Sequence, residues 1–511
     1  MLNDVSGIRL CASLMLVALC LPAQNLKEFE KKVTEFTLAN GLHFIVVERH
    51  EAPVVSFHTY VNAGSVDDPK GETGLAHMFE HMAFKGTETI GTKNWPEEQK
   101  AIAAVDELYE KLDAERNKGP KADQSAIIVL EGQIKRAIEY ANSFVVPNEY
   151  TTIIEKNGGV GLNADTSYDD TEYFYSLPSN RIELWFLLES QRFLHPVFRE
   201  FYKERDVVME EQRMRVGSSP QGKLFQNFLA TAFEAHPYRN PGIGWPSDVE
   251  NLERPEARAF FEKYYVPANI TMAIVGDVHP AEARSLAERY FGPMPARPLP
   301  SLRLTTEPAQ SGPKEVAVES PSQPIVAVGY KRPDQYDKDD PVFDCLQLIF
   351  SSGRTGLLYK QLVEEKQVSL EAEAGATFPD GKYPNLFVFL LVPGQGHTRE
   401  DNEQALSELL GSFVSTKVDA ETMARVKATA RAGVIRRLAD NASLASLLTA
   451  YQANYGDWRK LFTSLDDINR VTADDVQRVA RQYFTARNRT VAYLQLPAGV
   501  KAGPRRQGGR Q

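Results

Sequence analysis

The chain contains very little cysteine: three residues in 511, at positions 11, 20 and 345. Two of them lie in an apolar run at the amino terminus, so the rest of the chain has Cys345 alone and cannot form an internal disulfide. Its stability must therefore come from buried cores. Cys345 lies in the apolar stretch 342–350, which is typical of a core residue rather than of a cysteine nucleophile.

Basic residues are also fewer than acidic ones, since 58 Lys and Arg stand against 68 Asp and Glu and the net charge is −10. A phosphate-binding surface needs clustered Lys and Arg, so we expect no nucleic-acid partner. The basic end of the chain, within residues 499–511, is interpreted as a disordered tail. The length is too great for one core and predicts roughly two to four domains.

The apolar run at the amino terminus is too short to span a bilayer comfortably. Arg9 precedes the run at residues 10–21, and Pro22-Ala23-Gln24 follows it. This pattern predicts a secretory signal peptide over residues 1–23, and hence a secreted or periplasmic protein. Two alternatives stay open: an uncleaved membrane anchor, and a lipoprotein modified at Cys20, although Leu19 is bulky for such a site.

Apolar periodicity predicts mixed strands and helices. In the first half we expect a strand pair joined at Asn40-Gly41 and an apolar helix over 75–84. A long helical stretch over 181–216 should break near His195-Pro196. Further strands are expected at 54–61, 161–167, 172–177 and 270–277, and a helix at 280–291.

A proline-rich segment, 292–300, separates this half from a second α/β unit. That unit is expected to contain strands over 315–330, helices over 341–352 and 357–365, and a final strand at 490–496. A faint repeat relates the halves, because an Asp-rich loop precedes an apolar helix in each, at 66–69 and at 337–341. The second helix has Asp344, Cys345 and Gln347 where the first has two histidines, so only the first half could hold a metal.

Residues from about 96 to 142 differ in kind from their surroundings. Two charged, alanine-rich amphipathic segments flank a Gly-Pro breaker at 119–120 and predict a helical hairpin. We expect Leu112 of the first helix to face Ile128 and Ile134 of the second. A solvated packing arm is the favoured interpretation of this hairpin.

The motif that indicates chemistry is His77-Met78-Phe79-Glu80-His81. The histidines are four residues apart, so on a helix both imidazoles can reach one Zn²⁺. Glu80 lies on an adjacent part of that face, where its carboxylate can take a proton from a zinc-bound water. The alternative, a helix with two unrelated surface histidines, does not account for the strand, glycine loop and apolar residues around the motif.

A catalytic zinc needs a third protein ligand, and the segment 204–211 offers glutamates in a helical pattern. Glu204 and Glu211 are two turns apart on one face, so both can point toward one site. Glu210 is rotated away toward solvent. Taken alone, this segment could equally be an exposed charged helix.

At these residues the chain resembles the pitrilysin/insulinase family of zinc peptidases, which includes mitochondrial processing peptidase. The resemblance extends from about Glu35 to Leu496. The segment Gly74–Gly86 is similar to the zinc helix of the family. Three other segments are similar to its substrate strand, its downstream glutamate helix and the close of its first domain: 158–167, 204–211 and 264–277.

The resemblance implies an α+β fold of two homologous α/β sandwich domains of the processing-peptidase/pitrilysin type, plus the inserted hairpin. The zinc-binding peptidase domain would span 32–292, the linker 293–314 and an inactive homologous domain 315–498. One Zn²⁺ per chain would be bound by His77, His81 and Glu211. Glu80 would be the general base, with Glu204 as a carboxylate that orients the site. Asn163 and Ala164 would lie on an edge strand that binds an extended peptide.

The second half departs from the family pattern. Some relatives have an arginine and a tyrosine there that grip substrate, whereas this chain has Val363 and Leu370 at the similar positions. The departure suggests a partner that completes the chamber, either in a homodimer or in a heterodimer with a related subunit lacking the zinc motif.

Three functions are therefore weighed. We expect a zinc-dependent endopeptidase acting on extended or unfolded peptides, in which Glu80 activates a zinc-bound water. The alternative is a catalytically silent scaffold or assembly subunit of the same family, which the complete set of His77, Glu80 and His81 disfavours. A metal-binding protein without catalysis explains neither Glu80 nor the second domain.

Overall fold

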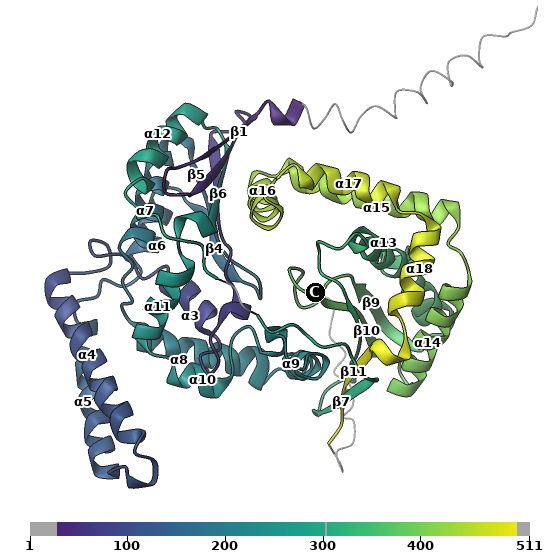
Figure 1. Ribbon diagram of the computed structural model, residues 1–511, viewed down its shortest axis with the longest axis horizontal. Helices are drawn as coiled ribbons and strands as arrows, with labels where there is room; N and C mark the ends of the chain where they lie inside the picture. Colours follow the sequence, from purple (N-terminus) through teal and green to yellow (C-terminus); the bar gives the residue numbers. More distant parts are fainter. Residues whose placement is uncertain (1–27, 302–303, 498–511) are drawn as a thin grey trace, which may run out of the picture.

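A computed structural model of the protein describes residues 28–301 and 304–497. The predicted signal peptide and the predicted tail lie outside these described residues. Two lobes face each other across the molecule, and each consists of one sheet with helices packed on it (Figure 1). This arrangement confirms the expected α+β fold with two homologous domains.

The sheet of the first lobe has six strands in the order β1-β2-β6-β3-β5-β4. Strands β2 and β6 pair in parallel, and all other neighbours are antiparallel. Gly41, at the predicted turn between β1 and β2, has a φ of 97°, which glycine adopts without strain. The strands are β1 (Val33–Thr37), β2 (His43–Glu48), β3 (Val54–Val61), β4 (Val160–Thr166), β5 (Thr171–Pro178) and β6 (Ile270–Gly276).

Helices cover one face of this sheet. The predicted stretch 181–216 is two helices, α7 and α8, because Pro196 cannot continue the hydrogen-bond ladder of the first. The helices are α3 (Leu75–Met82), α6 (Glu149–Lys156), α7 (Ile182–Leu194), α8 (Phe201–Gln212), α9 (Pro220–Ala232), α10 (Pro246–Asn251), α11 (Arg254–Tyr264) and α12 (Pro280–Phe291).

The predicted hairpin is present as α4 (Trp95–Arg116) and α5 (Gln124–Asn142), which project from the first lobe (Figure 1). Leu112 and Ile134 are buried as expected. The expectation for Ile128 is wrong, because its side chain is 67% exposed. Residues 127–130 are all apolar and occupy every side of one helical turn, so their pattern could not identify the face that packs on α4.

A buried ion pair fixes the base of the hairpin to the body of the lobe. Nε of Arg199 lies 2.6 Å from Oε1 of Glu98 on α4. The same guanidinium donates to the backbone carbonyls of Lys85, Thr87 and Ile90. The hairpin is thereby joined to the chain that follows α3.

The sheet of the second lobe repeats the first without a counterpart of β1. Its order is β7-β11-β8-β10-β9, with β7 and β11 parallel, as β2 and β6 are. The chain order of strand, helix, strand, strand is also the same, since β8, α13, β9 and β10 correspond to β3, α3, β4 and β5. The strands are β7 (Lys314–Glu319), β8 (Val326–Arg332), β9 (Ser369–Gly375), β10 (Asn385–Pro393) and β11 (Arg489–Gln495).

The helix that corresponds to α3 in the second lobe is α13 (Asp340–Phe350), where Cys345 is fully buried and unpaired. Burial raises the pKa of its thiol to about 12, which agrees with an inert core residue. The predicted helix over 357–365 is present, mostly as a π-helix, η9 (Tyr359–Glu365). The other helices are α14 (Arg399–Ser415), α15 (Ala420–Ala439), α16 (Asn441–Tyr455), α17 (Lys460–Arg470) and α18 (Ala473–Tyr483).

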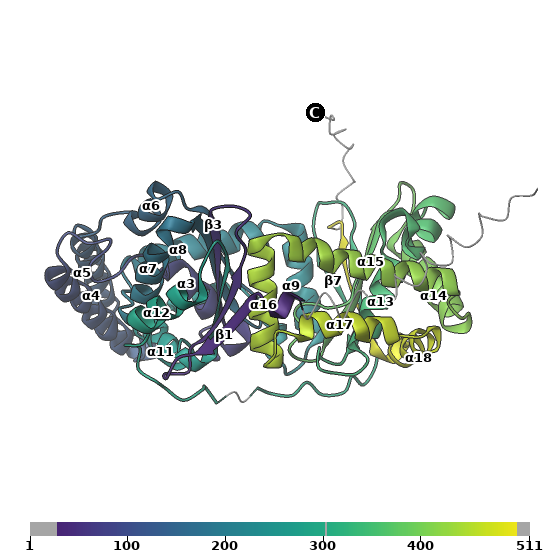
Figure 2. The ribbon, with the colours of Figure 1, turned by 90° about the horizontal axis from the view of Figure 1, so that it is seen from above.

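The lobes exchange one helix each. From the first lobe, α9 packs Leu224 and Phe228 against the sheet of the second, beside Ala327 and Ala492. From the second lobe, α16 packs against β3 and β6 of the first, where Leu448 joins the core. Both views show α16 beside the first sheet and α9 beside the second (Figures 1 and 2). Each sheet is thus covered on its second face by a helix of the other lobe.

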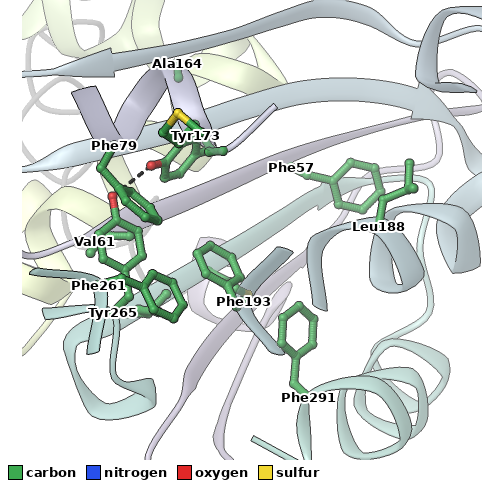
Figure 3. Packing of buried hydrophobic residues seen from close by; sticks show 14 of the residues in the cluster. Phe57, Val61, Phe79, Ala164, Tyr173, Leu188, Phe193, Phe261, Tyr265 and Phe291 are labelled. Atoms are coloured by element: carbon green, nitrogen blue, oxygen red, sulfur yellow. Dashed lines mark hydrogen bonds between the residues drawn. The ribbon is translucent and has the colours of Figure 1, made fainter. Parts of the chain in front are cut away.

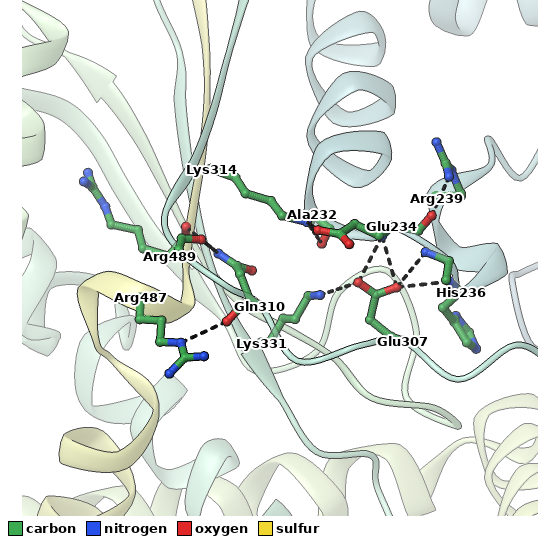
Figure 4. Close-up of polar contacts among 12 residues, drawn as sticks. Ala232, Glu234, His236, Arg239, Glu307, Gln310, Lys314, Lys331, Arg487 and Arg489 are labelled. Atoms are coloured by element: carbon green, nitrogen blue, oxygen red, sulfur yellow. Dashed lines mark hydrogen bonds and ion pairs between the residues drawn. The ribbon is translucent and has the colours of Figure 1, made fainter.

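Glu307, in the segment between α12 and β7, strengthens the junction between the two lobes. Glu307 accepts hydrogen bonds from the backbone amides of Glu234, Ala235 and His236, just beyond the end of α9 (Figure 4). It also pairs with Nζ of Lys331 on β8. These contacts outweigh the effect of burial and lower the pKa of Glu307 to about 2.

Among the residues that the structure describes, no helix is long and apolar enough to cross a membrane.

Candidate metal centre

The loop before α3 fixes where this helix begins. Gly74, its N-cap, has a φ of 93°. Asp68 accepts hydrogen bonds from the backbone amides of Gly74 and Ala76, both at 2.8 Å. A carboxylate at the start of a helix satisfies free amides and interacts favourably with the helix dipole. The predicted helix therefore begins close to its expected position.

Aromatic packing fixes the rotation of α3. Phe79 packs on Tyr265 and Phe261 of the first-lobe core, with ring centroids 4.3 and 5.3 Å apart (Figure 3). The hydroxyl of Tyr265 lies 2.8 Å from that of Tyr173 on β5, which ties this cluster to the sheet. With Met78 and Phe79 buried in the core, the helix presents His77 and His81 toward α8.

The structure brings together the three predicted ligands, His77, His81 and Glu211. Oε2 of Glu211 lies 3.3 Å from Nε2 of His77 and 3.3 Å from Nε2 of His81. The three potential ligand atoms all lie within 4.8 Å of one another. Ligand atoms bound tetrahedrally at ~2.1 Å from one zinc ion are roughly 3.4 Å apart, which matches the distances from Glu211 to both histidines.

Glu80 contacts the His77 ring on the side opposite Glu211. Its Oε2 is 3.5 Å from Nδ1 of His77, the ring nitrogen that does not face Glu211. That oxygen is buried and has no hydrogen-bond partner among the described residues. A buried carboxylate oxygen without a partner is costly, and a water molecule in the site would satisfy it.

Glu204 approaches the site from the opposite side of His81. Its Oε2 lies 3.5 Å from Nδ1 of His81, and its other oxygen contacts Nζ of Lys85. Burial alone would raise the pKa of Glu204, but His81 and Lys85 outweigh burial and lower that pKa. Glu204 thus stays ionised and contacts the nitrogen of the His81 ring that does not face Glu211.

Two basic residues of the site were missed by the sequence analysis. Lys85 follows His81 by four residues, and Arg215 follows Glu211 by four, with its Nη2 2.7 Å from Oε1 of Glu211. For Arg215 the i,i+4 spacing behind Glu211 was the available signal, whereas Lys85 lies beyond the end of α3 and had no such signal. The hydrogen bond with His77, together with the charges of Arg215 and His81, lowers the pKa of Glu211 to about 2.

Glu210 is turned away from the site, as its place on the helix predicted. It pairs with Arg213, and both side chains are more than half exposed.

The predicted substrate strand, β4, is the outermost strand of the first sheet. It pairs with β5 through Asn163 opposite Phe174 and Ala164 opposite Tyr173, and its other edge is unpaired within the described chain. Ala164 is buried in the core, whereas Asn163 is exposed on the other face. Because α3 packs beside β4, this free edge runs next to the metal centre.

The two departures from the family pattern lie in the second lobe. Val363 is in η9, and Leu370 is the second residue of β9, with a side chain 41% exposed. Neither side chain can form the hydrogen bonds or ion pairs that an arginine and a tyrosine would supply.

Two family models match the chain. The model described as insulinase (peptidase family M16) matches residues 44–114 and 143–244. The model described as peptidase M16 inactive domain matches residues 251–430. The gap in the first match, 115–142, begins within α4 and includes all of α5.

Similar proteins cover nearly all of the chain. A zinc protease of Helicobacter pylori, PqqE, is 25% identical over 498 residues, which are 94% of this chain and 97% of that protein. The mitochondrial-processing peptidase subunit beta of Lentinula edodes is 22% identical and covers 91% of this chain and 90% of its own length.

Solved structures share the fold. A protease from Helicobacter pylori matches with a TM-score of 0.75 at 24% identity, over 91% of this chain and 99% of that one. The first half of the periplasmic protease PqqL from Escherichia coli matches with a TM-score of 0.65 at 18% identity, over 91% and 92% of the two chains.

Proposed function

Because the chain belongs to the insulinase family of peptidases, peptidase family M16, we propose that it is a zinc-dependent endopeptidase. Its substrates would be extended or unfolded peptides. The observation that carries this proposal is the convergence of His77, His81 and Glu211 from two helices, with a buried oxygen of Glu80 in contact with the His77 ring.

His77, His81 and Glu211 would hold the zinc ion, which when bound supplies a Lewis acid that polarises water and the scissile carbonyl. Glu80 accepts a proton from the attacking water as the water oxygen adds to the carbonyl carbon. The same carboxyl then gives that proton to the departing amine as the carbon–nitrogen bond breaks. Glu80 is partly buried and its Oε2 is shielded from solvent, which suits this exchange because a carboxyl group shielded from bulk water keeps its proton for the reaction.

Peptide binding would use the free edge of β4. An extended peptide added there would pair its backbone with the strand around Asn163 and Ala164. Backbone pairing fixes the direction and depth of the peptide without requiring a particular side chain at each position. The edge lies beside α3, so the strand would present a peptide bond to Glu80.

We also propose that the protein is secreted or periplasmic and works with a second subunit. The basic-flanked apolar run at residues 10–21 supports export, and one structural neighbour is described as a periplasmic protease. Val363 and Leu370, where some relatives have substrate-gripping residues, support a homodimer or a heterodimer with a related subunit that lacks the zinc motif.

The Glu80→Gln variant tests the proposed function. The amide keeps the size of the side chain but cannot act as a base, so zinc content should stay near one equivalent at this centre while peptide hydrolysis falls by about a hundredfold or more. The matched control is Glu210→Gln, which alters an exposed glutamate of α8 and should leave both quantities unchanged. Full hydrolysis by Glu80→Gln would refute the mechanism. Wild-type protein with neither zinc nor hydrolysis would favour the scaffold alternative.

A further inference from the structure

A second group of metal-ligating side chains lies on the first lobe, outside the centre described above. Glu48 ends β2, His50 follows it in the loop to β3, and His279 is the N-cap of α12 just after β6. One potential ligand atom of each lies within 4.8 Å of the others. We propose that Glu48, His50 and His279 form a second zinc site, open to solvent and separate from the catalytic centre.

The distances within this group fit a single ion. Oε1 of Glu48 lies 3.5 Å from Nε2 of His50 and 3.5 Å from Nδ1 of His279. Tetrahedral ligands of zinc are roughly 3.4 Å apart, and the catalytic centre shows nearly the same spacing. Two imidazoles and one carboxylate form a donor set that borderline divalent ions such as Zn²⁺ prefer, with a fourth position left for water.

The carboxylate of Asp277 orients the ring of His50. Nδ1 of His50 lies 2.7 Å from Oδ1 of Asp277, which leaves Nε2 directed at Glu48. Metal-binding histidines commonly bond a carboxylate through the second ring nitrogen, because this bond fixes the ring and increases its basicity. Glu48 and Asp277 also offset the positive end of the α12 dipole, which on its own would disfavour a cation.

The backbone that carries these side chains is held by the sheet. Strands β2 and β6 run in parallel with Glu48 opposite Gly276, so the carboxyl ends of the two strands lie side by side. The amide of Arg49 donates to the carbonyl of Gly276, and that of Asp277 donates to the carbonyl of Val54. The site would therefore need little ordering when an ion binds.

The two metal positions lie toward opposite ends of β3. Val55, at the beginning of β3, pairs with Gly276, which lies beside the second group. From the other end of β3 the chain runs on to α3, which carries the first metal position. Zinc at the second position therefore cannot touch Glu80 or the catalytic ligands. It would instead be next to Arg49, whose guanidinium donates to the carbonyls of Leu438 and Ala439 at the junction of α15 and α16.

Counting bound zinc tests the proposal on the intact chain. After removal of metal, titration with Zn²⁺ followed by calorimetry and elemental analysis should find two equivalents for the wild type. It should find one equivalent for His279→Ala and one for Glu48→Gln. The matched control is His195→Ala, another exposed histidine, which approaches the single carboxylate of Glu88, and this variant should keep two.

The double variant His77→Ala/His81→Ala separates this proposal from the proposed function. It should keep one equivalent of zinc, and adding His279→Ala should remove that equivalent. Unchanged circular dichroism and thermal unfolding of each metal-free variant would verify that the chain is folded. The proposal is overturned if the wild type and His279→Ala bind equal amounts of zinc. A chain that binds only the His279-dependent ion would contradict the catalytic centre while supporting the second site.

Discussion

Glu204 contacts Nδ1 of His81, the ring nitrogen opposite the one that faces Glu211, at a distance of 3.5 Å. The imidazole is therefore fixed between two carboxylates of a single helix, α8. Burial alone would lower the pKa of His81, but the charges of Glu204, Glu211 and Glu80 outweigh burial and raise it. The same negative charge favours a cation at this position.

Replacing Glu204 should therefore weaken metal binding without removing it. We expect Glu204→Gln to lower zinc affinity by about 10–100-fold, because a carboxylate behind a ligand histidine contributes this much. Competition with a chromophoric chelator measures the affinity. Glu210→Gln is the matched control on the same helix, and an equal loss of affinity in both variants would contradict the orienting role of Glu204.

Glu307 should stabilise the junction between the lobes, and its contribution should depend on pH. Glu307→Gln exchanges charge-assisted hydrogen bonds for weaker ones and leaves Lys331 without its ion pair. We therefore expect the free energy of unfolding to fall by an amount on the order of 2–4 kcal/mol at pH 7. The carboxyl has an ordinary pKa of 4.5 and a folded pKa of about 2. The stabilisation is thus complete above pH 4.5 and is lost as the pH falls toward 2.

Thermal unfolding at a series of pH values measures this effect. The difference in midpoint between wild type and Glu307→Gln should be constant near neutral pH and shrink below pH 4.5. Glu315→Gln is the control, because Glu315 is half exposed and its ion pair with Arg399 contributes little. A difference that persists unchanged at pH 2.5 would contradict the assigned pKa.

The proposed pairing of a peptide backbone with β4 predicts how modified peptides are cleaved. Methylating one backbone nitrogen of a substrate removes a hydrogen-bond donor and leaves every side chain in place. We expect slow cleavage when the methyl group lies on an amide that faces β4, and near-normal cleavage when it lies on the next amide, because alternate amides of a strand point to opposite edges. Uniform effects along the peptide would argue against strand addition at Asn163 and Ala164.

If a second subunit is required, the specific activity should depend on protein concentration. If two copies complete the chamber, the specific activity should fall as the protein is diluted through the dissociation constant of the dimer. Sedimentation velocity over the same concentrations would show the change in mass. Constant specific activity of a monomeric chain would refute the homodimer, and activity that appears only with a co-purified protein would support a heterodimer.

Local spacing made half of the metal centre predictable. His77, Glu80 and His81 lie within one helical turn, so the geometry of the helix alone determines which side they share. Glu211 is 130 residues beyond His81, and its approach depends on how α8 packs beside α3. Helical spacing offered both Glu204 and Glu211 as candidates, and only the resemblance to a family selected Glu211 as the predicted ligand. Lys85 was missed because it lies past the end of α3, where helical spacing no longer determines direction.

Buried polar contacts and uniform apolar runs limited the rest of the prediction. Arg199 and Glu98 are 101 residues apart and form an ion pair that is almost completely buried. No local pattern marks such a pair, because each residue alone resembles an ordinary surface charge. Ile128 was misplaced for the opposite reason, since the apolar run 127–130 occupies every side of that one turn of α5.

The exchange of α9 and α16 has a consequence for the integrity of the molecule. Because each lobe contributes a helix to the core of the other, the lobes are held together by more than the covalent connection after α12. A single proteolytic cut in that connection would leave two fragments that remain bound and co-elute. Either fragment made on its own would expose the apolar face of a sheet and the apolar side of a helix, and would aggregate. The two halves thus behave as one obligate assembly that happens to be encoded in a single chain.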